Sequence, residues 1–406
     1  MRDVLQGVKV VEVASWTFVP AAGAVLADWG ADVLKIEHPV TGDPQRGLIS
    51  SGLIPAGAGG INYIMEQPNR GKRSVALDLG TDDGRELLYR LAETADVFLT
   101  NFLPDARERL LIDVEHIRAR NPDIIYVRGT GQGVRGPDAR KGGYDGASYW
   151  ARGGLAMALT PAGLEWPISP RPAFGDVMGG MTIAGGIAAA LFRRERTGEP
   201  SVVDVSLLGL ALWNLGPDVV ASKLYETTHA PRPFDRAESP NPVVGVYRTQ
   251  DGRFIMLMML ESDRYWADFC RHIERPELID DPRFKDAAAR YENRRACVGV
   301  LDEVFASRPF ADWLSTLSTL EGVWAPMQTV REVHDDPQSV ANGYLPTVAS
   351  AEGVEFTLVA NPVQFDETSP ELSPAPDHGQ HTEEVLLELG LTWPEIAGHK
   401  DSGAIL

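Results

Sequence analysis

The chain has 406 residues, of which 44% are hydrophobic, and a formal net charge of −19 at pH 7. A chain of this length and composition is expected to form a globular protein with more than one domain. The acidic balance argues against nucleic acid or an anionic membrane as a partner, because both require a basic face. An anionic ligand would therefore have to bind at a local cluster of arginine and lysine side chains.

Cysteine usage and the first residues indicate a reducing compartment. The two cysteines, Cys270 and Cys297, share no metal-ligand spacing and are too few for a disulfide framework. The N-terminal residues have no apolar signal core, and no apolar run approaches the roughly 20 residues that span a bilayer. The eight histidines form no H-E-x-x-H pair, so no metal site is expected. We expect a cytoplasmic protein.

An α/β domain is predicted from the N-terminus onwards. Apolar strands are expected at residues 8–13 and 32–37, with a helix at 21–29 between them, which makes a right-handed βαβ unit. The alternation continues with a helix at 84–94 and with strands at residues 74–79, 96–100, 123–128 and 201–206. Strands that alternate with helices predict a parallel sheet. One long helix is expected over residues 207–224.

A glycine-rich apolar helix is predicted to begin within residues 172–180 and to run to Leu191. Asp176 lies at its start, where unpaired backbone N–H groups and the helix dipole favour an ionised carboxylate. Such a carboxylate is a candidate nucleophile, and backbone N–H groups near Gly179 and Gly180 are candidate donors to an oxyanion. The alternative is a purely structural helix cap.

The character of the chain changes after the long helix. Residues 229–242 carry four prolines among charged residues, which is typical of a linker and predicts a domain boundary. A smaller domain is expected to follow, with a hairpin at 243–259 and helices around 266–271 and 294–305. The chain becomes extended again near Val323, and a final capped helix is expected to open at Thr382.

Three loops are candidate ligand sites. Glu37 ends the second strand, where an acidic residue of an NAD enzyme would hold a ribose hydroxyl. The segment 15–20 between the first strand and helix lacks the glycines of the dinucleotide-binding fingerprint, so an NAD enzyme is only a weak alternative. The basic segment 70–74 could meet a phosphorylated ligand or could be a solvated loop. Asn101 and Phe102 end a strand where open α/β sheets bind ligands, and the glycine-rich segment 131–145 is expected to cover a site.

These pieces, in this order, resemble the class III CoA transferases, which include formyl-CoA, carnitine and bile-acid CoA transferases and also α-methylacyl-CoA racemase. The resemblance spans nearly the whole chain. It is carried by the segments LQGVKVVE at 5–12, LADWGADVLKIE at 26–37, GKRSVALDL at 71–79, ADV at 95–97, NF at 101–102, GYD at 143–145, GD at 175–176, RTG at 196–198, VDVS at 203–206, DPQ at 336–338 and HTEEVL at 381–386.

The resemblance implies a Rossmann-like large α/β domain with a parallel sheet, a smaller α+β domain inserted in it, and an interlocked homodimer. The domains are then residues 1–228, 229–330 and, as a return segment that completes the large domain, 331–406. Asp176 matches the family's catalytic aspartate, and Asp145 lies beside the thioester. The implied contacts with coenzyme A are Thr17, Phe18, His38, Leu77, Asn101, Phe102, Arg109, Lys141 and Tyr144.

Two departures from the family bear on function. The racemase branch has a histidine before the aspartate of the glycine-rich loop, whereas this chain has Tyr144, a poor acid/base group at neutral pH. Residues 258–260 are bulkier than the glycine run of formyl and oxalyl enzymes, which implies a larger and less polar acyl group. We therefore expect an enzyme that moves CoA from an acyl-CoA donor to a carboxylic acid acceptor, without a metal. The alternatives are a racemase-type isomerase and a non-catalytic acyl-CoA-binding protein.

Overall fold

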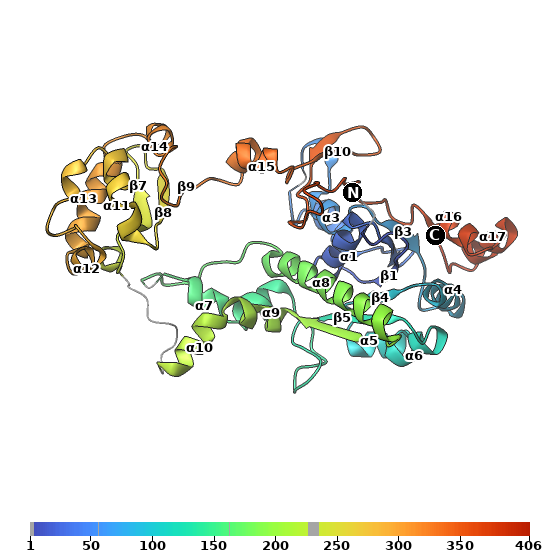
Figure 1. Cartoon of the computed structure of the whole chain (residues 1–406). Helices are drawn as coiled ribbons and strands as arrows, with labels where there is room; N and C mark the ends of the chain where they lie inside the picture. The colour runs from blue at the N-terminus through green and yellow to red at the C-terminus, as the bar shows by residue number, and fades with distance from the viewer. Residues whose placement is uncertain (1–3, 56, 162, 226–234) are drawn as a thin grey trace. The chain divides into compact units, whose positions relative to one another are not determined.

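The computed structural model describes residues 4–55, 57–161, 163–225 and 235–406. The chain forms two compact units (Figure 1). The larger unit contains Met1–Leu224 and Pro337–Leu406, and the smaller contains Tyr225–Asp336. The boundary predicted between residues 228 and 229 lies outside the described residues, and the boundary predicted after residue 330 precedes Asp336.

A six-stranded parallel sheet forms the centre of the larger unit, which confirms the predicted sheet. Its strand order is β3-β2-β1-β4-β5-β6, the order of a Rossmann-like sheet, and the order reverses between β1 and β4. The strands are β1 Lys9–Val13, β2 Asp32–Glu37, β3 Arg73–Ala76, β4 Val97–Thr100, β5 Ile125–Thr130 and β6 Val202–Ser206.

Both faces of this sheet are covered, so apolar side chains lie on both sides of its strands, although single charged residues interrupt several of them. Successive residues belong to different cores: Val10 packs with helices α1 (Phe18–Asp28) and α8 (Phe174–Thr197), whereas Val11 packs with α4 (Asp82–Glu93). The second core also includes side chains of three further helices, which are α6 Val114–Arg120, α16 Thr382–Glu388 and α17 Trp393–Asp401. The C-terminal segment therefore completes the larger unit.

Helix α8 packs closely on α1 because it carries glycines at the contact. A Cβ atom on Gly179 would lie 2.3 Å from the Phe18 ring, and one on Gly180 would lie 2.5 Å from the Ala21 Cβ. Among the described residues, α8 is the one helix whose length and composition would allow it to cross a membrane, which was not expected from the sequence. Buried helices of soluble proteins pass the same test.

Two helix predictions are wrong in detail. Residues 207–224 form two helices, α9 Leu207–Asn214 and α10 Gly216–Leu224, because Pro217 has no N–H group with which to continue the helix. Thr382 is not a side-chain cap, since its hydroxyl donates to the Gly379 carbonyl and accepts from the Ala76 N–H group. The last helix is instead α17, which begins with a capping box at Thr392.

The smaller unit has a three-stranded antiparallel sheet, β7-β8-β9, which contains the predicted hairpin. Its core holds Tyr247, Phe305 and Trp313. Both cysteines are free and buried there, and burial raises the pKa of each thiol to about 12. The elements are β7 Val244–Arg248, β8 Phe254–Met258, β9 Trp324–Pro326, α11 Ser262–His272, α12 Ala287–Glu292, α13 Arg294–Ala306 and α14 Phe310–Thr316.

Short elements complete the larger unit. They are α2 Gly47–Ser50, α3 Tyr63–Asn69, α5 Pro104–Arg109, α7 Leu155–Leu159, α15 Pro337–Ala341, β10 Thr347–Ala349 and β11 Glu355–Thr357.

Candidate active site

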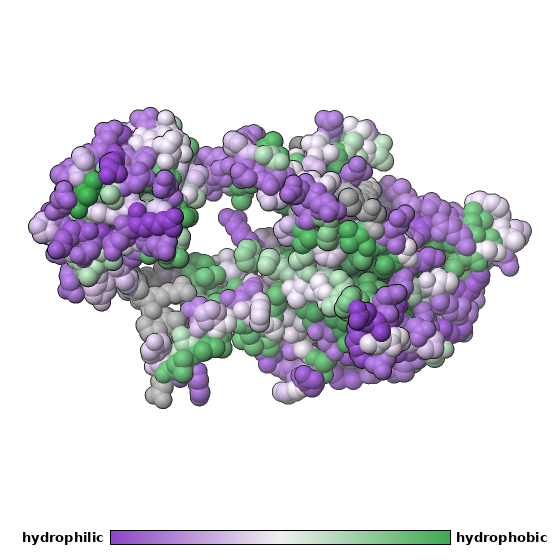
Figure 2. All heavy atoms as spheres, viewed as in Figure 1, coloured by the Kyte–Doolittle hydropathy of each residue, from purple (hydrophilic) through white to green (hydrophobic). Residues whose placement is uncertain are grey.

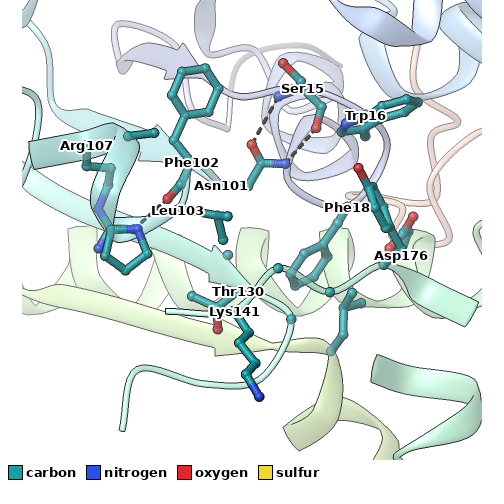
Figure 3. A pocket seen from close by; sticks show the side chains of 18 of the residues that line it. Ser15, Trp16, Phe18, Asn101, Phe102, Leu103, Arg107, Thr130, Lys141 and Asp176 are labelled. Carbon is teal, nitrogen blue, oxygen red and sulfur yellow. Dashed lines mark hydrogen bonds between the residues drawn. The ribbon is translucent and has the colours of Figure 1, made fainter. Parts of the chain in front are cut away.

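The site lies at the carboxyl ends of β1 and β4, where the strand order reverses. The loops that follow these two strands are joined by a pair of hydrogen bonds: the Ser15 N–H group donates to Asn101 Oδ1 at 3.1 Å, and Asn101 Nδ2 donates to the Ser15 carbonyl at 2.6 Å (Figure 3). Open α/β sheets bind ligands in the crevice at this point.

A cavity of about 370 Å³ opens beside these loops. Six of the residues predicted from the sequence line it, namely Phe18, Asn101, Phe102, Lys141, Tyr144 and Asp176. The remaining lining comes from the ends of the strands, from α5 and from the glycine-rich loop, and includes Ser15, Trp16, Pro44, Leu103, Arg107, Thr130, Gly131, Gly142, Gly143 and Leu207. The glycine-rich segment therefore forms part of the cavity wall.

Asp176 lies in the first turn of α8, and a carboxylate from another segment caps that turn. The residue at the N-cap position, Ala173, has a left-handed backbone with φ of 58° and provides no side-chain cap. Instead, the Gly175 N–H group donates to Asp145 Oδ1 at 2.8 Å, and the N–H groups of Phe174 and Asp176 also interact with the Asp145 carboxylate. Asp145, which is 7% exposed, thus satisfies the free N–H groups of the helix.

Capping by Asp145 changes the electrostatics of Asp176. Burial raises the pKa of Asp145, and the backbone N–H groups that donate to its carboxylate lower that pKa by a smaller amount. Burial and the charge of Asp145 raise the pKa of Asp176 from 3.8 to about 7. The expectation that the helix terminus keeps Asp176 ionised is therefore wrong, because the N–H groups at that terminus interact with Asp145. The two carboxyl groups form a coupled pair.

The oxyanion donors expected near Gly179 and Gly180 are also not found. Both glycines lie beyond the first turn of α8, where a helical N–H group bonds to the carbonyl four residues earlier. Their lack of a side chain serves the close contact with α1 described above.

Four predicted contact residues do not line the cavity. Thr17 donates its hydroxyl to Gln45 Oε1 at 3.0 Å, and the Leu77 side chain is 1% exposed within a core. His38 is exposed, and its Nδ1 accepts from the backbone of the following turn. Arg109 is exposed at the end of α5.

A second arginine of α5 does line the cavity. Arg107 is 4% exposed, donates to the Phe102 carbonyl at 2.6 Å and lies 3.3 Å from a carboxylate oxygen of Asp113. The sequence places Arg107 just beyond the strand end at Asn101, but neither Arg107 nor Trp16 is among the contacts that the family resemblance implies. The position of a residue relative to a strand end would have identified them.

The basic side chains of segment 70–74 form ion pairs with acidic side chains of the same chain. Arg70 bonds to Asp28 at 2.7 Å, and Lys72, whose pKa burial lowers to about 8, bonds to both oxygens of Glu12 at 2.8 Å. The segment is therefore neither a phosphate site nor a solvated loop.

Glu37 does not offer a ribose contact. It is 4% exposed. Burial raises the pKa of its carboxyl, but Arg46, Lys35 and Ser74 together more than offset that effect and lower the pKa to about 2. Glu37, the residue that supported the hypothesis of an NAD enzyme, is therefore not available to bind a ribose. Within the described part of the chain, no group of three or more His, Cys, Asp or Glu side chains is placed to hold a metal ion.

Comparisons with known proteins agree with this architecture. The chain is 31% identical to the (R)-2-hydroxy-4-methylpentanoate CoA-transferase of Clostridioides difficile, covering 99% of each chain. It is 32% identical to the cinnamoyl-CoA:phenyllactate CoA-transferase of Clostridium sporogenes, covering 97% of this chain and 95% of that one. The crystal structure of a CaiB/BaiF family protein from Brucella suis superposes with a TM-score of 0.80 at 29% identity, over 96% of this chain and 100% of the other.

The family model described as CoA-transferase family III matches residues 5–382, which is most of the chain and contains every residue of the cavity. Together with a curated relative that is more than 30% identical over nearly its whole length, this match places the protein in CoA-transferase family III.

Proposed function

We propose that the protein moves CoA from an acyl-CoA donor to a carboxylic acid acceptor through an aspartyl-CoA thioester on Asp176. The observation that carries the proposal is the position of Asp176, which is the one acidic side chain among the described residues that line the cavity. A carboxylate in a partly desolvated site can attack a thioester, because burial removes water that would otherwise solvate the nucleophile.

The chemistry needs only carboxylates and thiolates. A carboxylate oxygen of Asp176 attacks the donor thioester carbonyl, the carbon–sulfur bond breaks, and a mixed anhydride and CoA thiolate form. The thiolate then attacks the aspartyl carbonyl, which releases the donor acid and leaves the aspartyl-CoA thioester. The acceptor carboxylate attacks that thioester, and the thiolate returns to the acceptor acyl carbon, which regenerates free Asp176. No net proton or water is consumed.

The pKa of Asp176 suits this role near neutral pH. A carboxylate with its pKa raised to about 7 is a more basic oxygen nucleophile than an ordinary aspartate, and half of it is ionised at that pH. In this proposal Asp145 is a positioning residue that holds the start of α8 and maintains the raised pKa of its neighbour. The glycine-rich loop limits the access of water to the anhydride.

The residues proposed to hold coenzyme A are those predicted from the sequence that line the cavity, with Phe102 and Asn101 at the strand end and Lys141 on the loop. Lys141 is largely exposed and reaches Asp138 at 2.7 Å, so it can exchange that partner for a phosphate. Arg109, exposed on α5, is a second cation available to the phosphates.

The test compares steady-state transfer by the wild type, Asp176→Asn and a matched control, Asp82→Asn, which removes an exposed acid from the first turn of α4. Loss of a covalent nucleophile is expected to lower the transfer rate at least about a thousandfold, while Asp82→Asn keeps wild-type activity. Full transfer by Asp176→Asn, with deamidation excluded by mass, would overturn the proposal. Deuterium uptake at the α-carbon without an acceptor acid would support an isomerase instead, and CoA binding without any transfer would support a binding protein.

We further propose a homodimer. Helices α9 and α10 present apolar side chains to solvent, including Trp213 at 81% exposure and Val220 at 60% (Figure 2). Exposed apolar surface of this kind marks protein interfaces. Sedimentation equilibrium should give twice the chain mass, and Val220→Glu should shift the protein toward the monomer. A wild-type monomer at micromolar concentration would contradict the proposal.

A further inference from the structure

Trp16 has a backbone conformation that a bulky residue rarely adopts. Its φ is 68°, in the left-handed region, whereas most positive-φ positions in the described chain are glycines. Such a conformation is retained only where surrounding contacts enforce it, and it is concentrated at ligand sites. The residue lies in the loop that follows β1 and lines the cavity.

Buried charges enforce this conformation. The Trp16 N–H group donates to Asp43 Oδ1 at 3.1 Å, and Asp43 Oδ2 is 2.8 Å from Lys35 Nζ. The side chains of Asp43 and Lys35 are fully buried. Ser15, the residue before Trp16, is held by its two hydrogen bonds to Asn101. The two peptide groups that precede the Trp16 Cα atom are therefore both held by hydrogen bonds.

The indole belongs to an aromatic wall beside Asp176. Trp16 and Tyr144 make an edge-to-face contact, with ring centroids 5.7 Å apart and an interplanar angle of 87°. The Phe18 ring fits against Gly179, one turn of α8 beyond Asp176. Figure 3 shows Trp16 and Phe18 on the same side of the cavity as Asp176.

Among the described residues that line the cavity, none on this side carries a positive charge. The cations among these lining residues are Arg107 and Lys141. Arg107 is engaged by the Phe102 carbonyl and by Asp113, as described above, and Figure 3 shows both cations away from Asp176. A second carboxylate on the acyl chain would therefore meet aromatic rings and the Asp176 carboxyl without a counter-ion, which is unfavourable.

We propose that Trp16 is a specificity-determining residue whose indole, together with the Tyr144 ring, forms the wall against which the acyl chain lies. The wall selects monocarboxylic acids with branched or aromatic chains over dicarboxylic acids. This inference rests on the proposed function, since it assumes that the thioester carbon lies at Asp176.

The test measures kcat/KM for four donors, phenylpropanoyl-CoA, 4-methylpentanoyl-CoA, acetyl-CoA and succinyl-CoA, each with its free acid in isotopically labelled form as acceptor. The variants are Trp16→Gly, which removes the ring and suits the left-handed backbone, and Trp16→Phe, which retains an aromatic ring. Trp166→Ala is the matched control, because Trp166 is 76% exposed and does not line the cavity.

The wild type should prefer the two apolar donors to succinyl-CoA. Trp16→Gly should lower the ratio of kcat/KM for phenylpropanoyl-CoA over acetyl-CoA by about 10- to 100-fold, the range for apolar pocket contacts. Trp16→Phe should retain most of the wild-type ratio, and Trp166→Ala should leave the ratio unchanged. If Trp16→Gly fails to fold, Trp16→Phe and Tyr144→Leu replace it in the test. In both of these variants the ratio of kcat/KM for phenylpropanoyl-CoA over acetyl-CoA should fall below the wild-type ratio, by a smaller factor than expected for Trp16→Gly.

An equal loss for all donors in Trp16→Gly would make Trp16 a structural residue and would overturn the inference. A wild type that prefers succinyl-CoA would overturn it as well. Either result leaves the proposed function intact as long as Asp176→Asn abolishes transfer. If the wild type transfers no CoA from any donor, the proposed function itself fails.

Discussion

Replacement of Asp176 by Asn should make the folded protein more stable, by an amount that grows with pH. In the folded protein the pKa of Asp176 is raised from 3.8 to about 7, by burial and then by the charge of Asp145. Below pH 3.8 the carboxyl is protonated in both the folded and the unfolded chain, so its ionisation costs nothing. Above pH 7 it is ionised in both, and the folded state carries the full cost.

The magnitude follows from the interval between the two pKa values. That interval corresponds to about 4 kcal/mol, of which about 3 kcal/mol accrues between pH 5 and pH 8. Asp176 is only partly buried, so solvent screening brings the expected change down to about 2 kcal/mol. The neutral amide of Asn carries no such cost. The difference in unfolding free energy between Asp176→Asn and the wild type should therefore increase by about 2 kcal/mol from pH 5 to pH 8.

Urea unfolding, followed by circular dichroism at equal protein concentrations, measures this difference. The contributions of groups that do not interact with Asp176 cancel when the variant and the wild type are compared at each pH. Asp82→Asn serves again as the control for removal of an acid from a first helical turn. A difference for Asp176→Asn that stays constant from pH 5 to pH 8 would refute the reasoning, because it would mean that Asp176 is well solvated.

Two further predictions concern the start and the middle of α8. Asp145→Asn removes the charge that raises the pKa of Asp176, so the pH profile of transfer should move to lower pH; a profile with an unchanged midpoint would contradict the coupling of the two carboxyl groups. Gly179→Ala places a methyl group within 2.3 Å of the neighbouring ring and should destabilise the protein by about 1–3 kcal/mol. Gly185→Ala on the same helix, with open space at its Cβ, should stabilise by about 1 kcal/mol, as thermal unfolding would show; equal effects of the two would argue against the close contact of α8 with α1.

The sheet was predictable because its strands are buried on both faces. A parallel strand of this kind is built mainly from apolar side chains, and the strand predicted at 32–37 coincides with β2, which contributes Val33, Leu34 and Ile36 to the cores. The position of Asn101 at the cavity was predictable for the same reason, since it follows a strand end. The break between α9 and α10 could also have been predicted, because Gly216 and Pro217 stand together in the sequence.

Contacts between distant segments could not be predicted from local patterns. Local rules assign the cap of α8 to the residue just before it, which is Ala173, whereas the cap comes from Asp145. Lys72 has the sequence context of a solvated lysine, and only the fold shows that Glu12 is its partner. The left-handed backbone of Trp16 likewise depends on Asp43, which lies on another loop.

The central claim is that Asp176 carries CoA covalently during transfer. Its most direct test is the intact mass of the protein after incubation with the donor panel, with and without hydroxylamine, beside Asp176→Ala. We predict a CoA-sized adduct that hydroxylamine removes and that Asp176→Ala never forms. A wild type that transfers CoA efficiently but shows no adduct under rapid quench, or an adduct that persists in Asp176→Ala, would contradict the account.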